Sequence, residues 1–119
     1  MNATRQTEPT LHLPLKRKWF EMIRSGVKKE EYREFGPYWK KRLLDEDDEY
    51  RRTVNIQIRP YTRVTFTLGY PRLDDPDRIM TFECDEITVG RGNPDWGAPD
   101  QDVFIIKIGE RIKLKIKFS

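Results

Sequence analysis

Apolar and polar residues alternate in several short segments of the chain, and this two-residue period restricts the fold more than any other feature. Leu11, Leu13 and Leu15 are separated by His12 and Pro14, and the same alternation recurs further along. Because successive side chains of a strand point to opposite faces of a sheet, such segments predict strands with one buried face. The extended segments are residues 11–15, 54–58, 64–68, 79–89 and 103–118, the last divided at Gly109 and Glu110. Together they predict one barrel-like sheet.

Two other segments have the spacing of helices. Trp19, Phe20, Met22 and Ile23 recur with a helical period, and Gly26 follows where a helix would end. We therefore predict helices at residues 16–25 and 38–44, with a strand at residues 28–35 between them. The fold class is thus α+β, with an N-terminal helix and a second short helix.

The length of 119 residues fits a single domain. We expect residues 1–9 to be a disordered tail and residues 10–119 to form the domain. Pro14 cannot donate a main-chain hydrogen bond, which predicts that the first strand lies at an edge of the sheet. Residues 45–49, 74–77 and 90–102 are expected to be an acidic loop, a turn and a glycine-containing loop.

The charges are unevenly distributed along the chain. Through Leu44 there are 11 basic and 5 acidic residues, whereas from Asp45 onward there are 12 basic and 15 acidic residues. A concentration of positive charge in the first third is the pattern expected of a local footprint for an anion or a nucleic acid.

Several classes of protein are disfavoured by what the sequence lacks. With one cysteine, Cys84, and one histidine, His12, the chain cannot form an internal disulfide or a Cys/His zinc cage. No apolar run is long enough to span a bilayer, and no phosphate-binding or nucleophile-elbow motif occurs. We expect a cytoplasmic protein with no membrane partner, no metal and no cofactor. Any catalysis would depend on Lys, Glu, Asp, Arg or Tyr.

Residues 26–33 read G-x-K-x-x-E-x-R, with the predicted strand running through them. Alternation places Glu31 and Arg33 on one face of that strand, and Glu30 and Tyr32 on the other. If Lys28 lies on the preceding turn, Lys28 and Arg33 can hold a phosphate while Glu31 orients both cations or bonds a base edge. The alternative is a solvated strand whose surface ion pairs contribute about 0–1 kcal/mol each to folding.

This motif, with the order of strand, helix and motif before it, resembles the ASCH domain of the PUA-like β-barrel superfamily. The segments Gly69-Tyr70 and Asn93 to Ala98 also resemble those of small bacterial and phage ASCH proteins. The resemblance implies a small barrel with a cleft beside the motif, where RNA or a modified nucleoside binds.

Some ASCH proteins remove the acetyl group from N4-acetylcytidine, using the motif lysine, a threonine three residues later and a distant glutamate; others are credited with ribonuclease activity. The lysine corresponds to Lys28, but Glu31 occupies the threonine position, and only Glu86 and Asp95 are candidates by region for the distant acid. A Lys28/Glu31 pair could still act as acid and base on a bound water.

We therefore expect RNA or nucleotide binding through Lys28, Glu31 and Arg33. Aromatic faces can stack on bases, which makes Tyr32, Trp39 and Trp96 candidate ligand contacts, with Trp96 on a loop that could form a lid. A hydrolase acting on an acylated nucleoside or on RNA, with Lys28 and Glu31 as catalytic residues, remains an alternative. A protein-interaction module, which would have no basic cleft, is a third interpretation, and the oligomeric state stays open.

Overall fold

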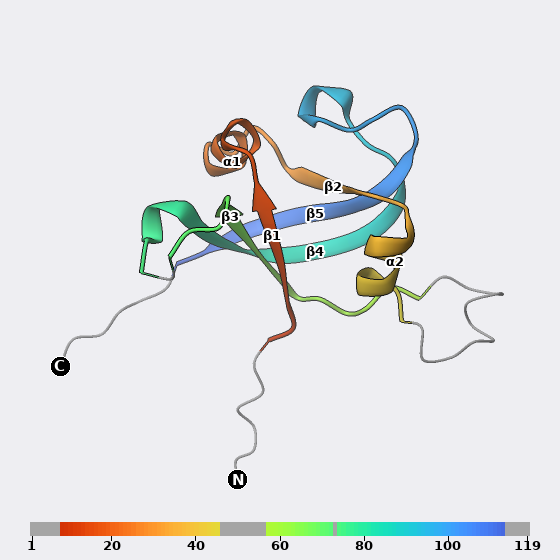
Figure 1. Cartoon of the computed structure of the whole chain (residues 1–119), viewed down its shortest axis with the longest axis horizontal. Coiled ribbons are helices and arrows are strands. Elements are labelled where there is room, and N and C mark those ends of the chain that lie inside the picture. Colours follow the sequence, from red (N-terminus) through yellow and green to blue (C-terminus); the bar gives the residue numbers. More distant parts are fainter. Residues whose placement is uncertain (1–7, 46–56, 73, 114–119) are drawn as a thin grey trace, which may run out of the picture.

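A computed structural model describes residues 8–45, 57–72 and 74–113 as an α+β fold built on one curled, five-stranded sheet (Figure 1). The strands are β1 (Thr10–Leu15), β2 (Glu30–Glu34), β3 (Arg63–Leu68), β4 (Ile79–Arg91) and β5 (Asp102–Ile112). The helices are α1 (Arg17–Arg24) and α2 (Pro37–Leu43), with the short 3-10 turns η1 (Pro76–Arg78) and η2 (Pro94–Trp96). The predicted α+β class is confirmed, and the predicted barrel-like sheet is present as a curled half-barrel.

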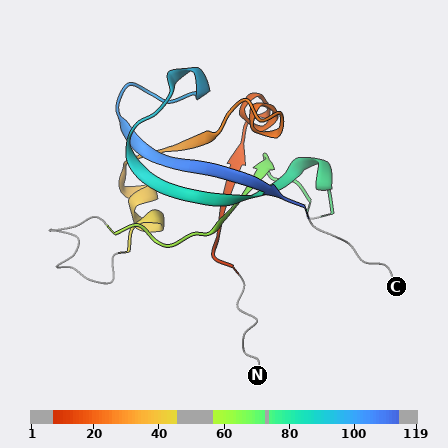
Figure 2. The same ribbon diagram turned by 180° about the vertical axis from the view of Figure 1, so that it is seen from behind.

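The strand order is β1-β3-β4-β5-β2, so β1 and β2 occupy the two ends of the sheet. β1 runs parallel to β3, with Leu11 opposite Val64, and every other pairing among these strands is antiparallel. The long strands β4 and β5 curl strongly, and β1 passes across the concave side of the sheet (Figure 1, Figure 2). The edge position that Pro14 predicted for β1 is confirmed.

One main core fills the inside of the curl. It combines the inward residues of β1 with aromatic residues of β3, β4 and β5 and with two residues of α1. Its fully or nearly fully buried members include Leu13, Phe20, Ile23, Leu43, Val64, Phe66, Met80, Phe104 and Ile106. The period-two pattern therefore identified the buried face of β1 and β3.

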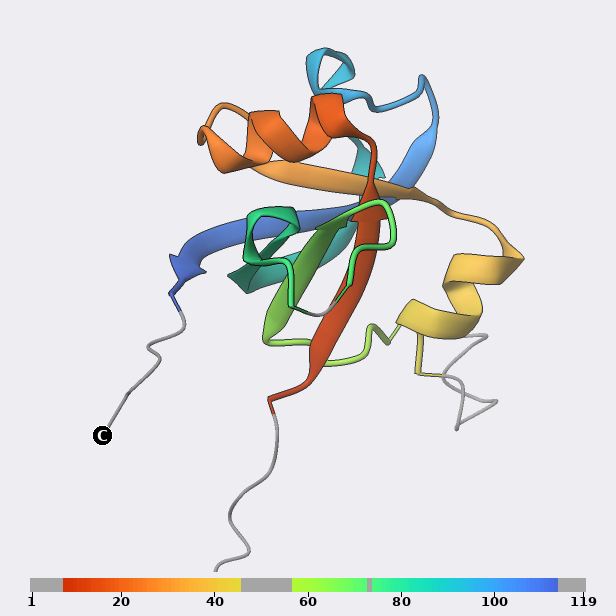
Figure 3. The same ribbon diagram turned by 60° about the vertical axis from the view of Figure 1, so that its left-hand side comes forward.

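The first helix is shorter than residues 16–25 but ends where the sequence indicated. The main-chain N–H of Ser25 donates to Glu21, and Gly26 follows at a φ of 85°. Phe20 and Ile23 are its buried residues, and the helix lies alongside the first part of β2 and near the upper end of β1 (Figure 3). This placement brings the first turn of α1 next to the motif.

Two expectations about strand boundaries were wrong. β5 continues through Gly109 and Glu110, because register shifts in its pairing with β4 around Cys84 absorb the interruption. β4 extends to Arg91, into the predicted loop. The carbonyl of Pro9 accepts hydrogen bonds from the N–H groups of Thr62 and Arg63. The division into a tail at residues 1–9 and a domain from residue 10 stays a prediction.

Some predicted segments lie outside the described residues. They are most of the tail (1–7), most of the acidic loop, residues 54–56 of a predicted strand, and residues 114–118 of the last one. Ile58, at the end of the predicted strand 54–58, forms an isolated antiparallel bridge with Leu44.

Candidate functional site

A pocket of about 300 Å³ opens where the end of β1, the first turn of α1, β2 and η2 meet. We call it the motif pocket. It is lined by Pro14, Leu15, Lys16, Trp19, Glu31, Tyr32, Arg33, Trp96 and Gly97. Four of the six residues predicted to bind a ligand are therefore together on its wall.

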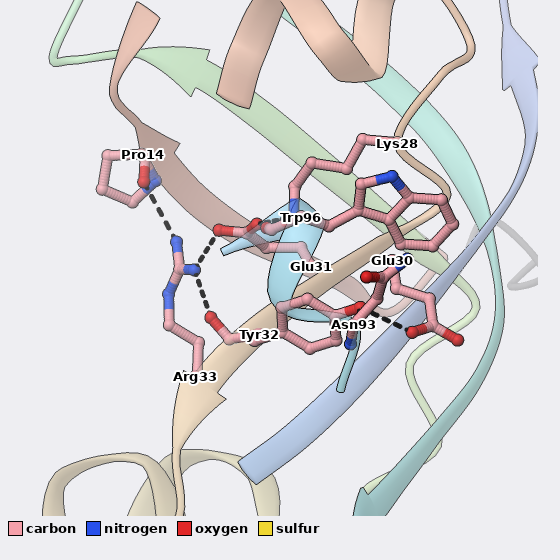
Figure 4. A network of polar contacts seen from close by, with 8 residues as sticks. All are labelled: Pro14, Lys28, Glu30, Glu31, Tyr32, Arg33, Asn93 and Trp96. Atoms are coloured by element: carbon pink, nitrogen blue, oxygen red, sulfur yellow. Dashed lines mark hydrogen bonds and ion pairs between the residues drawn. The ribbon is translucent and has the colours of Figure 1, made fainter. Parts of the chain in front are cut away.

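Glu31 is the centre of an ion-pair cluster at this pocket (Figure 4). Its Oε1 lies 3.0 Å from Nζ of Lys28, and its Oε2 accepts a hydrogen bond from Nη1 of Arg33. The side chains of Lys28, Glu31 and Arg33 are 0%, 8% and 15% exposed. The cluster is thus buried, which contradicts the alternative of a solvated strand with surface ion pairs.

Lys28 lies beneath the pocket instead of on its wall. Its Nζ donates to the carbonyl oxygen of Trp96 at 2.6 Å and sits 4.7 Å from the ring centre of Tyr32 and 5.1 Å from a ring centre of Trp19. Burial lowers the pKa of Lys28, although the charge and hydrogen bond of Glu31 oppose that effect. Lys28 therefore positions Glu31 and the η2 loop and is not itself exposed to a ligand.

Arg33 connects the motif to the opposite end of the sheet. Nη2 donates to the carbonyl of Pro14 at 3.0 Å, and Nη1 donates to the carbonyl of Tyr32 at 2.7 Å as well as to Glu31. On its outer side the guanidinium lies 5.4 Å from a ring centre of Trp39. Arg33 thus forms part of the pocket wall in a fixed orientation.

The predicted alternation along β2 is confirmed by how its side chains pair. Glu31 pairs with Arg33, whereas the hydroxyl of Tyr32 donates to Oε1 of Glu30 at 2.7 Å and accepts from the main-chain N–H of Asn93 at 3.0 Å. Burial raises the pKa of Tyr32 well above its usual value. Tyr32 is therefore neutral, and its hydroxyl anchors the loop before η2 by accepting from Asn93 while it donates to Glu30.

The η2 loop is tied down at several points. In addition to the bonds from Lys28 and to Tyr32, the side chain of Asn93 accepts from the N–H of Asp95 at 2.9 Å. Gly97 has a φ of 97°, and a Cβ there would lie 2.8 Å from Cζ2 of Trp19. These contacts hold half-buried Trp96 at the pocket wall and fix the loop that the sequence suggested as a lid.

The remaining candidate residues lie elsewhere. Trp39 borders a neighbouring pocket between β1 and α2. Glu86 is exposed on β4 and pairs with Lys107 at 3.1 Å, and exposed Asp95 does not border the motif pocket. Neither Glu86 nor Asp95 therefore lines the motif pocket as the distant acid would.

Among the charged and aromatic residues of the wall, sequence reasoning missed two, Lys16 and Trp19. In the sequence, Trp19 fits the apolar period of the helix. The spacing of three residues between Lys16 and Trp19 places them on one side of the first helical turn, and this was the available signal.

The wall combines aromatic and charged groups. Trp19, Tyr32 and Trp96 offer ring surfaces, while Lys16 and Arg33 carry positive charge against the one carboxylate of Glu31. The positive charge of Lys28 lies directly behind that carboxylate. The chemistry of the pocket therefore suits a flat ring that carries an anionic group.

Within the described ranges, no group of three or more His, Cys, Asp or Glu side chains is arranged to hold a metal ion.

Comparison of the chain with family models, with curated proteins and with solved structures gave no match. A search of the described residues for a helix long and apolar enough to cross a membrane found none.

Proposed function

We propose that the protein is a PUA-like domain of the ASCH type that binds single-stranded RNA or a nucleotide in the motif pocket. The observation that carries the proposal is the meeting of three aromatic side chains and two cations around a buried, ion-paired carboxylate. The G-x-K-x-x-E-x-R motif supplies the carboxylate, Glu31, and its ion-pair partners, Lys28 and Arg33.

The aromatic residues would hold the base. A volume of about 300 Å³ is small for a ligand site but accommodates one nucleobase. Stacking on a protein aromatic contributes about 1–3 kcal/mol per base. Trp19, Tyr32 and Trp96 surround that volume.

Glu31 would read the edge of the base. Each of its oxygens already accepts a hydrogen bond from a cation and retains a second acceptor position. A carboxylate held in this way accepts from an exocyclic amine, such as that of cytosine. The contacts with Lys28 and Arg33 fix the direction of the Glu31 carboxylate, so a cytidine nucleotide is the first ligand to test.

Lys16 and Arg33 would contact the phosphate. Lys16 is exposed at the N-terminal end of α1, and within the described contacts Arg33 uses three of its five N–H donors. Lys28 is fully buried, so it supports the site from behind; this revises the expectation that Lys28 itself holds the phosphate.

The test is a titration of fluorescent single-stranded RNA at several salt concentrations. Phosphate contacts release condensed counterions, so the affinity should fall with salt. Lys16→Gln should make the slope of log affinity against log salt shallower by about 0.7, the value for one phosphate contact on a single strand.

The matched control is Arg78→Gln, because Arg78 pairs with Asp75 at 3.2 Å and borders neither of the two pockets. This variant should keep the slope of the parent. An absence of RNA binding at low salt would contradict the proposal and favour a protein-interaction module.

A hydrolase is the second candidate, and one observation favours it. Lys28 carries a lowered pKa and lies 3.0 Å from Glu31, as an acid/base pair would. However, the pocket exposes only Glu31 of the two, and a carboxylate stands where a hydroxyl nucleophile is expected. We therefore expect no release of acetate from N4-acetylcytidine. Turnover by the parent that disappears in Lys28→Ala would instead assign this activity.

A further inference from the structure

We propose that the pocket between β1 and α2 is a second nucleotide subsite, which takes the neighbouring residue of an RNA strand whose base occupies the motif pocket. This inference rests on the proposed function. It assigns a role to a surface that the G-x-K-x-x-E-x-R motif does not include.

The second pocket adjoins the first and is rich in aromatic side chains. It measures about 440 Å³, and Pro14 lies on the wall of both pockets. Tyr38, Trp39, Tyr61 and Tyr70 contribute rings to it. Tyr38 and Tyr70 are 58% and 93% exposed, which leaves ring surface free for stacking.

A series of stacked cations and rings connects the two pockets. The guanidinium of Arg33 lies 5.4 Å from a ring centre of Trp39, and the rings of Trp39 and Tyr38 meet edge to face at 5.0 Å. The guanidinium of Arg42 then lies 3.6 Å from the ring centre of Tyr38. These contacts hold the rings of Trp39 and Tyr38 in place before a ligand arrives, which reduces the conformational entropy lost on binding.

The charge of α2 fits a phosphate backbone. Its sequence is PYWKKRL, with three consecutive basic residues and no acidic one. Arg42 reaches the pocket itself, and its Nη1 donates to the carbonyl of Tyr38 at 3.1 Å. A strand leaving the motif pocket past Pro14 would therefore meet both stacking surfaces and positive charge. A single nucleotide would use only the first pocket.

The experiment compares cytidine monophosphate with cytidine oligonucleotides of increasing length on the parent, Tyr38→Ala and Tyr38→Phe. Tyr38→Ala should weaken the longer ligands by about 5- to 150-fold, the loss expected for one stacked aromatic, and leave the mononucleotide unaffected. Tyr38→Phe keeps the ring and should bind like the parent. Circular dichroism checks folding, which exposed Tyr38 should not affect.

A second variant tests the charge. Arg42→Gln should make the salt dependence shallower for oligonucleotides and leave it unchanged for the mononucleotide. Arg78→Gln should change neither.

The outcomes separate this inference from the proposed function. The second subsite is contradicted if the parent binds the mononucleotide but its affinity does not rise with oligonucleotide length. It is also contradicted if Tyr38→Ala weakens all ligands equally or weakens none. In either case the proposal for the motif pocket is unaffected. If the parent binds no ligand of the series, the proposed function fails, and the second subsite fails with it.

Discussion

Arg33 donates from Nη2 to the main-chain carbonyl of Pro14 at 3.0 Å, and this bond joins the two strands that lie at opposite ends of the sheet. Among the described residues, β1 pairs with β3 and β2 pairs with β5, and the two strands do not pair with each other. The side chain of Arg33 therefore links them directly. The same guanidinium forms part of the motif pocket. Arg33 therefore contributes both to the wall of the pocket and to the contact between β1 and β2.

Arg33→Lys tests this link. Lysine keeps the charge but cannot reach Glu31, Tyr32 and Pro14 together, because it lacks the planar fork of donors. We expect the free energy of unfolding to fall by about 1.5–3 kcal/mol, the range for a hydrogen bond to a charged group. Urea denaturation measures it. Arg91→Lys is the control, since Arg91 is exposed and pairs only with exposed acids in the described contacts; equal losses in the two variants would contradict the link.

Glu31→Gln tests the burial of the ion-pair cluster. A partly exposed carboxylate would barely affect stability, but Glu31 is buried between two cations, and its removal leaves Lys28 charged and enclosed. We expect a loss of about 3–5 kcal/mol. In thermal denaturation that corresponds to a fall in the midpoint of roughly 10 °C or more.

Glu86→Gln is the comparison, because Glu86 makes an exposed ion pair with Lys107. Its effect should stay within about 0.5 kcal/mol. A Glu31→Gln variant as stable as Glu86→Gln would show that the cluster does not contribute to folding.

Gly97→Ala tests how the η2 loop is held against α1. The substitution imposes a positive φ on alanine and also places a Cβ 2.8 Å from the ring of Trp19. Gly69→Ala imposes only the first cost, because a Cβ at that position would meet nothing within 4 Å. We expect about 1–2 kcal/mol for Gly69→Ala and a larger loss for Gly97→Ala, together with weaker RNA binding. Identical stabilities would mean that Trp19 does not press on the loop.

Cys84 gives a dependence of stability on pH. Burial, assisted by the charge of Asp85, raises the pKa of its thiol from 9.0 to about 11. The unfolded chain therefore loses this proton first, so the stabilising contribution is complete below the unfolded pKa and declines as the pH rises towards the folded pKa. Between about pH 8 and about pH 10 the parent should lose about 1 kcal/mol more than Cys84→Ala. Parallel pH profiles would contradict the shift.

The first strand, the end of the first helix and the side-chain pattern of the motif could be predicted from the sequence. The alternation of leucines in residues 11–15 and the glycine after the first apolar helix correspond to β1 and to the end of α1. The alternation of Glu31 and Arg33 with Tyr32 also follows from the geometry of a strand. These features depend on neighbours a few residues apart, which periodicity can detect.

The burial of Lys28 could not be predicted in the same way. The run from Lys28 to Arg33 is highly charged and is typical of a solvated surface. Lys28 is enclosed by Trp19 and by the carbonyl of Trp96, and the latter is 68 residues away in the chain. The parallel pairing of β1 with β3 is also non-local, and no local pattern in the sequence indicates it.

The central claim is that the motif pocket binds a nucleotide, and the indole N–H signals in a heteronuclear NMR titration with cytidine monophosphate test it most directly. The chain has three tryptophans, of which Trp19 and Trp96 line the motif pocket and Trp39 lines the neighbouring one. At low salt the signals of Trp19 and Trp96 should move together and saturate, while that of Trp39 moves least. Signals that stay in place, or a response of Trp39 alone, would contradict the account.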